Sequence, residues 1–189
     1  MKLTIQSLSE SFRVQFKRVS TQPAYMRTSE PSIVLTSSGF VFDEWYRRKY
    51  GLSNSTSSVA HFLAVGSTKG FEPNPLFRSK WYIEQHNLTS DQASIAAVHY
   101  LLVGSKGGMR PNPFFDPHWY RTTYPEVEAA NIDPLVHYLL HGANEGRHPA
   151  PGIYTPWLPQ ALDLSTGEQQ NPLVVFMELL DLLRSPTVA

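Results

Sequence analysis

Histidine is the residue type in this sequence best suited to act as a catalyst or a metal ligand, and three histidines recur at one spacing. His61, His99 and His137 lie 38 residues apart, and His141 follows His137 four positions later. Histidines at i and i+4 share one helix face and could bind zinc, although no third ligand stands at a suitable spacing. Because the three histidines repeat in step with aromatic residues, we expect each to make the same structural hydrogen bond. We therefore predict no metal site and no catalytic residue, with an enzyme that uses the His137 and His141 face as the remaining alternative.

Carboxylates and glycines are the next groups that could do chemistry. Asp43 and Asp116 stand just before predicted helices, where capping of the helix end explains them without a glycosidase-type pair. Two series of glycines recur, at 66, 104 and 142 and again at 70, 108 and 146. They follow predicted helices, whereas a phosphate-binding loop precedes one, so we expect Gly66, Gly104 and Gly142 to close their helices in a left-handed conformation. We predict no cofactor and interpret the chain as a non-enzyme.

Composition excludes several classes of protein. The 189 residues include no cysteine, which excludes a disulfide scaffold, a zinc ribbon and a thiol nucleophile. The 16 basic residues are balanced by 16 acidic ones, so the chain has no overall positive field to hold nucleic acid. No apolar run reaches the roughly 18 residues of a membrane span, and no secretory signal is recognisable. We expect a cytoplasmic protein, with peripheral attachment to the inner membrane as an option.

Charge is nevertheless unevenly distributed along the chain. Residues 1–41 contain five basic and two acidic residues, whereas residues 152–189 contain one basic and four acidic residues. The basic head and the acidic tail could attract one another, within one chain or between copies, although salt screens such attraction beyond about 8 Å.

A tandem repeat of about 38 residues organises most of the sequence. The four tryptophans, Trp45, Trp81, Trp119 and Trp157, are spaced by 36, 38 and 38 residues. Each stands in a block with further aromatic residues, and a second block downstream carries the histidine, an aromatic residue and the glycines. In the fourth copy the second block keeps the aromatic residue but loses the histidine. Matches at so many equal offsets do not arise by chance.

The two blocks predict two helices in each repeat. In the first block the aromatic residues fall on one helix face, and we expect this helix to continue to Tyr50 or Tyr124. The second block opens with Asp133-Pro134 in copy three and Asn171-Pro172 in copy four, a capping residue followed by a proline suited to the first helical turn. Such a unit cannot bury its aromatic face alone, so the units are expected to be stable only as an array.

The fold class that we expect is therefore all-α, a tandem array of short helix–loop–helix repeats. The repeats span about 42–76, 77–114 and 115–152, followed by a degenerate copy at 153–189. Residues 1–41 fall outside the period and are expected to form an N-terminal arm that is partly extended or disordered. Alternating apolar and polar residues at 11–17 are typical of an extended segment.

Copy three also carries a resemblance to a known family. Its motifs read Phe115-Asp116-Pro117-His118-Trp119-Tyr120, Asp133-Pro134-Leu135-Val136-His137-Tyr138-Leu139 and Gly142-Ala143-Asn144-Glu145-Gly146-Arg147-His148-Pro149. This pattern resembles the tandem motifs of bacterial proteins of cell-surface polysaccharide synthesis, often found beside glycosyltransferase domains. Copies one and two depart from it, with Phe71 and Met109 at the position of Arg147. The resemblance covers about residues 42–178 and implies an accessory role, because in such proteins the repeats accompany the catalytic domain.

Two surfaces could carry the function. The repeated aromatic pairs could stack on sugar rings, with the tyrosines better candidates for exposure than the tryptophans: Trp45 and Tyr46, Trp81 and Tyr82, Trp119 and Tyr120. The fourth copy ends in leucines that could dock on a protein: Leu179, Leu180, Leu182 and Leu183. We expect a non-catalytic scaffold that binds a glycosyltransferase or synthase partner, or further copies of itself. Direct polysaccharide binding along a groove of aromatic residues is the alternative.

Overall fold

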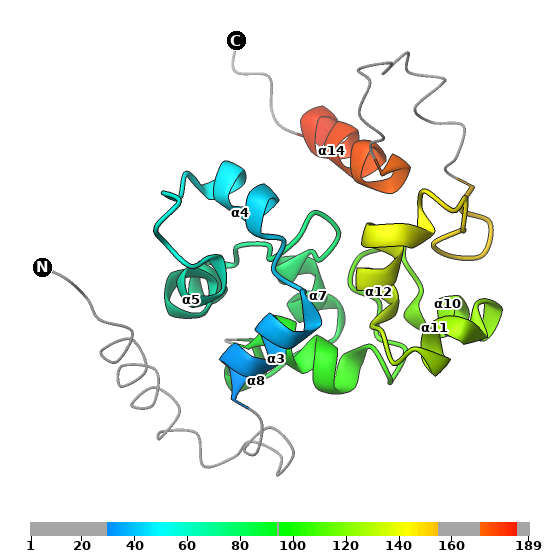
Figure 1. Ribbon diagram of the computed structural model, residues 1–189, viewed down its shortest axis with the longest axis horizontal. Coiled ribbons are helices and arrows are strands. Elements are labelled where there is room, and N and C mark those ends of the chain that lie inside the picture. The colour runs from blue at the N-terminus through cyan, green and yellow to red at the C-terminus, as the bar shows by residue number, and fades with distance from the viewer. Residues whose placement is uncertain (1–29, 94, 155–170, 185–189) are drawn as a thin grey trace, which may run out of the picture. The chain divides into compact units, whose positions relative to one another are not determined.

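The computed structural model describes residues 30–93, 95–154 and 171–184, and these residues form helices joined by turns (Figure 1). No strand occurs among the described residues; Asn112 with Phe115 and Ala150 with Ile153 form isolated bridges. The prediction of an all-α fold is confirmed for this part of the chain. Residues 1–29 of the predicted arm and the segment with Trp157 lie outside the described residues. The chain divides into two compact units, and the division falls after Gly104, inside the second sequence repeat.

The first unit is built from short helices. In chain order they are α3 (Pro31–Ser38), α4 (Asp43–Tyr50), α5 (Ser58–His61), η1 (Phe62–Gly66), α6 (Ser67–Lys69), α7 (Ser79–Gln85), α8 (Ser90–Ala93), α9 (Ala96–His99) and η2 (Tyr100–Gly104). The letter η marks a π-helical turn, in which hydrogen bonds join residues five positions apart.

The second unit repeats part of this order. It contains α10 (Pro117–Thr123), α11 (Pro125–Ala129), α12 (Pro134–His137), η3 (Tyr138–Gly142) and α14 (Pro172–Arg184). The short helix α11 lies where a plain loop was expected between the two predicted helices of a repeat, whereas α8 begins at Ser90, where an early start of the second helix was expected in copy two.

Helix α3 corrects the expectation of a partly extended arm for the last part of residues 1–41. Pro31 occupies the first turn of α3, and Gly39 ends the helix in the left-handed conformation at φ 64°. Leu35 and the following Phe40 are buried, and the Phe40 ring lies 5.2 Å from the ring of Phe77. The segment 31–38 is therefore a helix that contributes to the core, and the expectation of an extended chain is wrong there.

The helices of the first block form largely as expected. Helix α4 reaches Tyr50, but α10 stops at Thr123 and Tyr124 adopts φ −123° and ψ 72°. The residue before a proline avoids the α conformation, and Pro125 accordingly begins α11 instead of extending α10. The Asp116 side chain caps α10 by accepting the Trp119 N–H at 2.9 Å. Asp43 does not cap; it lies inside α4 and pairs with Arg47 at 2.7 Å, so the expectation of capping is wrong for Asp43.

Three helices of the second block, α5, α12 and α14, start at a capping residue, whereas α9 follows Ile95, whose side chain makes no capping bond. Asp133 accepts the N–H groups of Leu135 and Val136 at 3.0 and 3.3 Å, and Ser57 accepts that of Ala60 at 3.3 Å. Asn171 caps α14 in the same way, accepting the Leu173 N–H at 3.1 Å. These bonds satisfy donors that a helix start otherwise leaves unpaired.

The glycines that end these helices are not the ones predicted. Gly66 has φ −63° and the helix runs through it into α6, whereas Gly70 has φ 69° and closes the helix. The Phe71 N–H bonds to the Gly66 carbonyl at 2.8 Å and the Gly70 N–H to that of Ser67 at 3.3 Å, the pair of bonds of a Schellman motif. In the second unit Gly146, at φ 72°, takes the closing role instead of Gly142. The left-handed assignment of Gly66 and Gly142 is therefore wrong.

Candidate functional site

A buried tyrosine and a histidine form the same hydrogen bond three times. The tyrosine oxygen lies 3.0, 2.9 or 3.0 Å from histidine Nδ1 in the pairs Tyr46–His61, Tyr82–His99 and Tyr120–His137. The tyrosines come from α4, α7 and α10, and the histidines are the last residues of α5, α9 and α12. Each histidine thus makes the structural hydrogen bond expected from its spacing in the sequence.

Burial sets the protonation state of these pairs. Desolvation lowers the pKa of His61, His99 and His137, with smaller contributions from neighbouring cationic groups such as Lys69 and Arg147. Desolvation also raises the pKa of Tyr46 and Tyr120 far above the ordinary range. The three histidines, Tyr46 and Tyr120 are therefore neutral at pH 7, and the histidines are poor general acids in this setting.

A glycine completes each pair in the first and third copies. A Cβ atom built on Gly66 would collide with the hydroxyl of Tyr46, and one on Gly142 with the hydroxyl of Tyr120. A Cβ on Gly142 would also lie 3.3 Å from Nδ1 of His137. In a regular α-helix residues five apart point about 140° away from each other, so the π-helical turn is what brings the glycine beside the histidine. The signal that sequence analysis missed is the second glycine four residues later, which already supplies the helix end.

A second aromatic contact closes the turn after the helix in the first and third copies. The Phe71 ring stacks on Tyr50 at 4.0 Å, and the Arg147 guanidinium lies over Tyr124 at 4.8 Å. Both tyrosine hydroxyls accept a backbone N–H, from Glu72 at 2.8 Å and from His148 at 3.0 Å. Phenylalanine and arginine are both planar groups that stack on an aromatic face, which explains why one replaces the other at this repeat position.

Asp133 has a second role besides capping. It accepts a hydrogen bond from the Ser105 hydroxyl at 2.5 Å, and Arg121 binds the oxygen of that same hydroxyl at 2.7 Å. Desolvation raises the pKa of Asp133, and the hydrogen bonds from Ser105, Val136 and Leu135 and the charge of Arg121 oppose this effect. This network ties the start of α12 to α10 and to the turn at residue 105.

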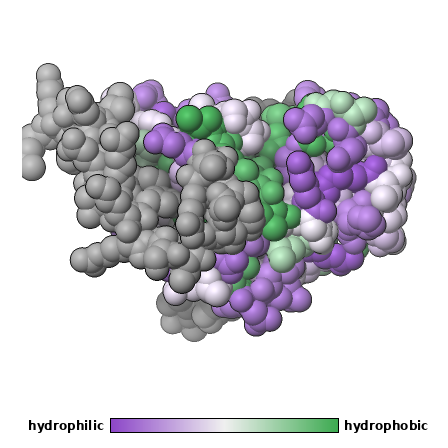
Figure 2. All heavy atoms as spheres, turned by 90° about the horizontal axis from the view of Figure 1, so that it is seen from below, coloured by the Kyte–Doolittle hydropathy of each residue, from purple (hydrophilic) through white to green (hydrophobic). Residues whose placement is uncertain are grey.

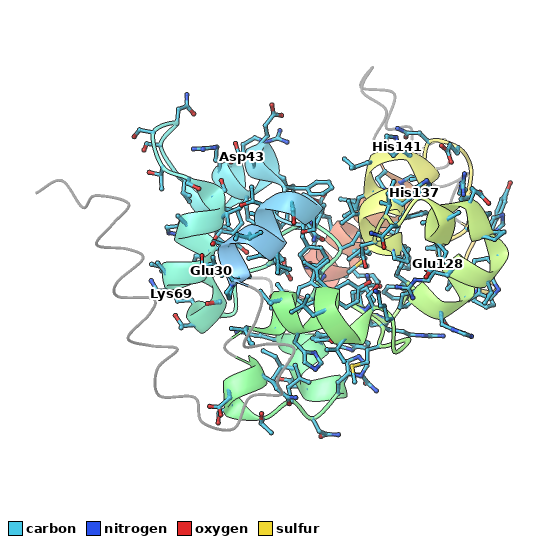
Figure 3. All side chains as sticks on the ribbon, turned by 60° about the horizontal axis from the view of Figure 1, so that its bottom comes forward. Glu30, Asp43, Lys69, Glu128, His137 and His141 are labelled. Carbon is cyan, nitrogen blue, oxygen red and sulfur yellow. The ribbon has the colours of Figure 1, made fainter. Side chains whose placement is uncertain are left out.

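The pair His137 and His141 is the metal site considered from the sequence. Both residues lie on one helix (Figure 3), with ring centroids 5.7 Å apart. His137 already uses Nδ1 in its bond with Tyr120. Among the described residues, no group of three His, Cys, Asp or Glu side chains is close enough to hold a metal ion.

The aromatic pairs proposed as a sugar platform divide into two classes. Tyr46, Tyr82 and Tyr120 are completely buried, so they cannot stack on a sugar ring, and this part of the prediction is wrong. The reason is that the tyrosine carries both a ring for the core and a hydroxyl that the buried histidine binds. The tryptophans next to them are instead half-buried: Trp45, Trp81 and Trp119. Lys49 Nζ lies 4.6 Å above the Trp45 ring and occupies one of its faces.

The predicted docking leucines lie at the end of α14, and their exposure increases toward the C-terminal end of the helix. Along one helix stripe, Val175 is buried, Leu179 is half-buried and Leu183 is 82% exposed. Leu182 is 71% exposed and Leu180 is half-buried. Separately from α14, the face drawn in Figure 2 carries a group of apolar residues among hydrophilic ones. We call Leu179, Leu180, Leu182 and Leu183 the α14 leucine surface.

Comparison with known proteins gives no relative: no protein-family model, no curated protein and no solved structure matches the chain. The helices among the described residues are too short or too polar to cross a membrane.

The contact between Tyr120 and Gly142 predicts a coupled pair of substitutions. Glycine to alanine inside a helix normally stabilises by about 0.5–1 kcal/mol, but Gly142→Ala should instead destabilise by about 1–3 kcal/mol because the new methyl group meets the Tyr120 hydroxyl. Tyr120→Phe removes that hydroxyl, so the double variant should lose at least about 1 kcal/mol less than the sum of the two single losses. Urea unfolding followed by circular dichroism measures all three.

Gly146→Ala provides the matched control, since a Cβ there meets nothing within 4 Å and its cost arises only from φ 72°. Its effect should add to that of Tyr120→Phe within about 0.5 kcal/mol. Simple additivity of Gly142→Ala with Tyr120→Phe would refute the proposed steric role of the glycine.

The three neutral histidines predict a loss of stability in mild acid. Their folded-state pKa values lie below the unfolded value near 6.5, so they stabilise the fold fully above pH 6.5 and progressively less as the pH falls below it. The urea midpoint should therefore decrease between pH 7 and 5. His137→Asn, which keeps a polar atom near the position of Nδ1, should flatten this dependence. An unchanged slope in His137→Asn would contradict the assignment.

Proposed function

We propose that this chain is a non-catalytic interaction module, built as a tandem array of helical repeats of about 38 residues. The module acts as an accessory in bacterial cell-surface polysaccharide synthesis and binds a glycosyltransferase or synthase partner. The observation that carries the proposal is the α14 leucine surface, an apolar helix face left exposed at the end of the described chain.

The recurring tyrosine–histidine pairs support the tandem array and a non-catalytic role. The hydrogen bond has almost the same length in all three copies, at 3.0, 2.9 and 3.0 Å. The paired tyrosine and histidine side chains, which could otherwise act as acids, bases or ligands, are thereby bonded to each other inside the repeat. A repeat whose histidine and tyrosine side chains point into the core is suited to binding through its surface.

The apolar stripe of α14 supports protein docking. Soluble proteins rarely leave adjacent leucines as exposed as Leu182 and Leu183, at 71% and 82%. Burial of one such side chain is worth about 1.5–3 kcal/mol, so covering these two residues provides a large part of the energy of a specific contact. An amphipathic helix that offers residues at i, i+3 and i+4 fits a hydrophobic groove on a partner.

The resemblance of copy three to repeats of polysaccharide-synthesis proteins supports the pathway. In those proteins similar motifs stand beside glycosyltransferase domains, which makes such an enzyme the first partner to test. A second copy of this chain is the other occupant that the leucines allow, and light scattering at increasing concentration measures that association.

Capture from the native host tests the docking proposal. The tagged chain should retain a glycosyltransferase or synthase, and Leu182→Asp/Leu183→Asp should reduce its recovery at least tenfold, which corresponds to about 1.4 kcal/mol. The control is Ile33→Asp/Leu140→Asp, since these residues are also exposed, at 63% and 51%, but lie outside α14. Recovery of no polysaccharide-pathway protein, or equal loss in the control variant, would count against the proposal.

Glycan binding is the second candidate, and the half-buried tryptophans are the observation that favours it. If Trp81 and Trp119 stack on sugar rings, titration with the host's own exopolysaccharide should shift the tryptophan emission of the wild type. The variant Trp81→Leu/Trp119→Leu should lose this response, whereas Trp45→Leu, whose ring Lys49 already covers, should keep it. An unchanged emission spectrum at saturating polysaccharide would exclude this function.

A further inference from the structure

The turn after the second helix of copy one collects basic side chains from three elements of the first unit. Glu72 in this turn lies 2.5 Å from Nζ of Lys49 and 2.8 Å from a guanidinium nitrogen of Arg78. The Lys80 side chain packs on the same turn, with its Cε 3.1 Å from the place that a Cβ atom on Gly70 would take. With the lysine of the turn itself, four residues form what we call the copy-one basic patch: Lys49, Lys69, Arg78 and Lys80.

The patch carries more positive charge than its acidic neighbour can balance. Four cations surround the single carboxylate of Glu72, which leaves a net charge of +3. Lys69 and Lys80 are exposed, and neither forms an ion pair with the part of the chain that the structure describes. Charges of one sign gathered on a small surface raise the local concentration of anions, so this turn attracts an anionic ligand.

The two exposed lysines are not required by the packing of the repeat. At the equivalent positions of the next copy the sequence has Gly107 and His118 in place of Lys69 and Lys80. Cβ of His118 lies 3.4 Å from the place of a Cβ atom on Gly108, so the same contact with the turn is made there without a lysine. The excess charge of copy one is therefore available for binding.

The surroundings of the patch favour one class of anion. Among the large apolar residues that the structure describes in the first unit, the exposed one is Ile33 on α3, so the patch lacks the apolar anchor that a protein partner uses. Single-stranded nucleic acid needs open aromatic faces for its bases, but Lys49 lies over the ring of Trp45. The ring of Phe71 is likewise stacked on Tyr50. An acidic polysaccharide binds through its carboxylates and hydroxyl groups and needs neither feature.

We propose that the copy-one basic patch binds an acidic polysaccharide through the carboxylates of its uronic acid units. Lys69 and Lys80 pair with these carboxylates, and the other two cations of the patch add longer-range attraction. Exposed ion pairs are individually weak and are screened by salt, so binding depends on several carboxylates along the polymer and weakens as salt is added. The inference goes beyond the proposed function, because it concerns a surface of the first unit and not the α14 leucine surface.

Fluorescence anisotropy with labelled polygalacturonate tests this inference, and the methyl-esterified polymer is the matched ligand without charge. The wild type should bind the acid at least about tenfold more tightly than the ester at about 50 mM salt, and about 200 mM salt should weaken that binding roughly tenfold. Equal affinity for acid and ester, no binding at the lower salt concentration, or tighter binding of an oligothymidylate of equal charge would overturn the proposal.

Matched variants locate the binding on the protein. Lys69→Gln/Lys80→Gln should weaken binding of polygalacturonate at least about fivefold at the lower salt concentration, whereas Lys69→Arg/Lys80→Arg should keep it within about twofold. Lys106→Glu makes the same change in net charge at one exposed residue outside the patch and should bind nearly as the wild type does. All these positions are exposed, so circular dichroism should show an unchanged fold. An equal loss in Lys106→Glu would refute the assignment to the patch.

Failure of this inference is distinguishable from failure of the proposed function. The anisotropy experiment uses the purified chain and polygalacturonate alone, and capture from the host depends on the leucines of α14. Capture that persists in Lys69→Gln/Lys80→Gln while polygalacturonate binding is lost shows two separate surfaces. Absence of binding in the wild type together with leucine-dependent capture removes only the polysaccharide site.

Discussion

The hydrogen bond between a buried tyrosine hydroxyl and histidine Nδ1 is the constraint on which each repeat depends. It places two polar groups inside the core, where each would be costly without the other, so the helices that carry them have to meet at one position. The hydroxyl in turn requires a residue without a Cβ beside it, and Gly66 and Gly142 meet that need. The π-helical turns follow from the same requirement, since they bring the glycine to the side of the helix that faces the tyrosine.

Copy four shows what happens when this constraint is released. At the positions equivalent to tyrosine, histidine and glycine the sequence has Leu158, Val175 and Leu180, so the three residues change together. Helix α14 is an uninterrupted α-helix from Pro172 to Arg184, in contrast to the α–π combinations of the other copies. Because copy four has no tyrosine hydroxyl at this place, a residue without Cβ is unnecessary. Leu180, which has a higher helix propensity than glycine, occupies the position.

Much of the fold could be predicted because its signals are local. Capping by Asp133, the proline at the first turn of α14 and the helical periodicity of the first block all act within a few residues. What the sequence did not reveal depends on contacts between distant residues. Whether Gly66 or Gly70 ends the helix is decided by a tyrosine about 20 residues away, and whether a tyrosine or its neighbouring tryptophan is buried is decided by the histidine opposite. The helix α3 was missed for another reason: a segment rich in Ser and Thr obscured the clear pair of signals Pro31 and Gly39.

Copy four lacks the glycine that ends the helix in the first and third copies. This absence accounts for the exposed leucines at the end of α14. In the first and third copies a glycine in the left-handed conformation turns the chain away after the helix, and the residues that follow return to pack on an aromatic ring. In copy four Arg184 stands at the position of Gly146, and the helix continues through the residues that elsewhere form the turn. Leu182 and Leu183 occupy the positions of Asn144 and Glu145, which are also exposed. The exposed leucines thus stand at positions that are polar in copy three. They are helical because copy four has no glycine at the position where the helix ends in copy three. Packing does not explain leucines at sites that copy three leaves to solvent, and this supports the proposal that the α14 leucine surface binds a partner.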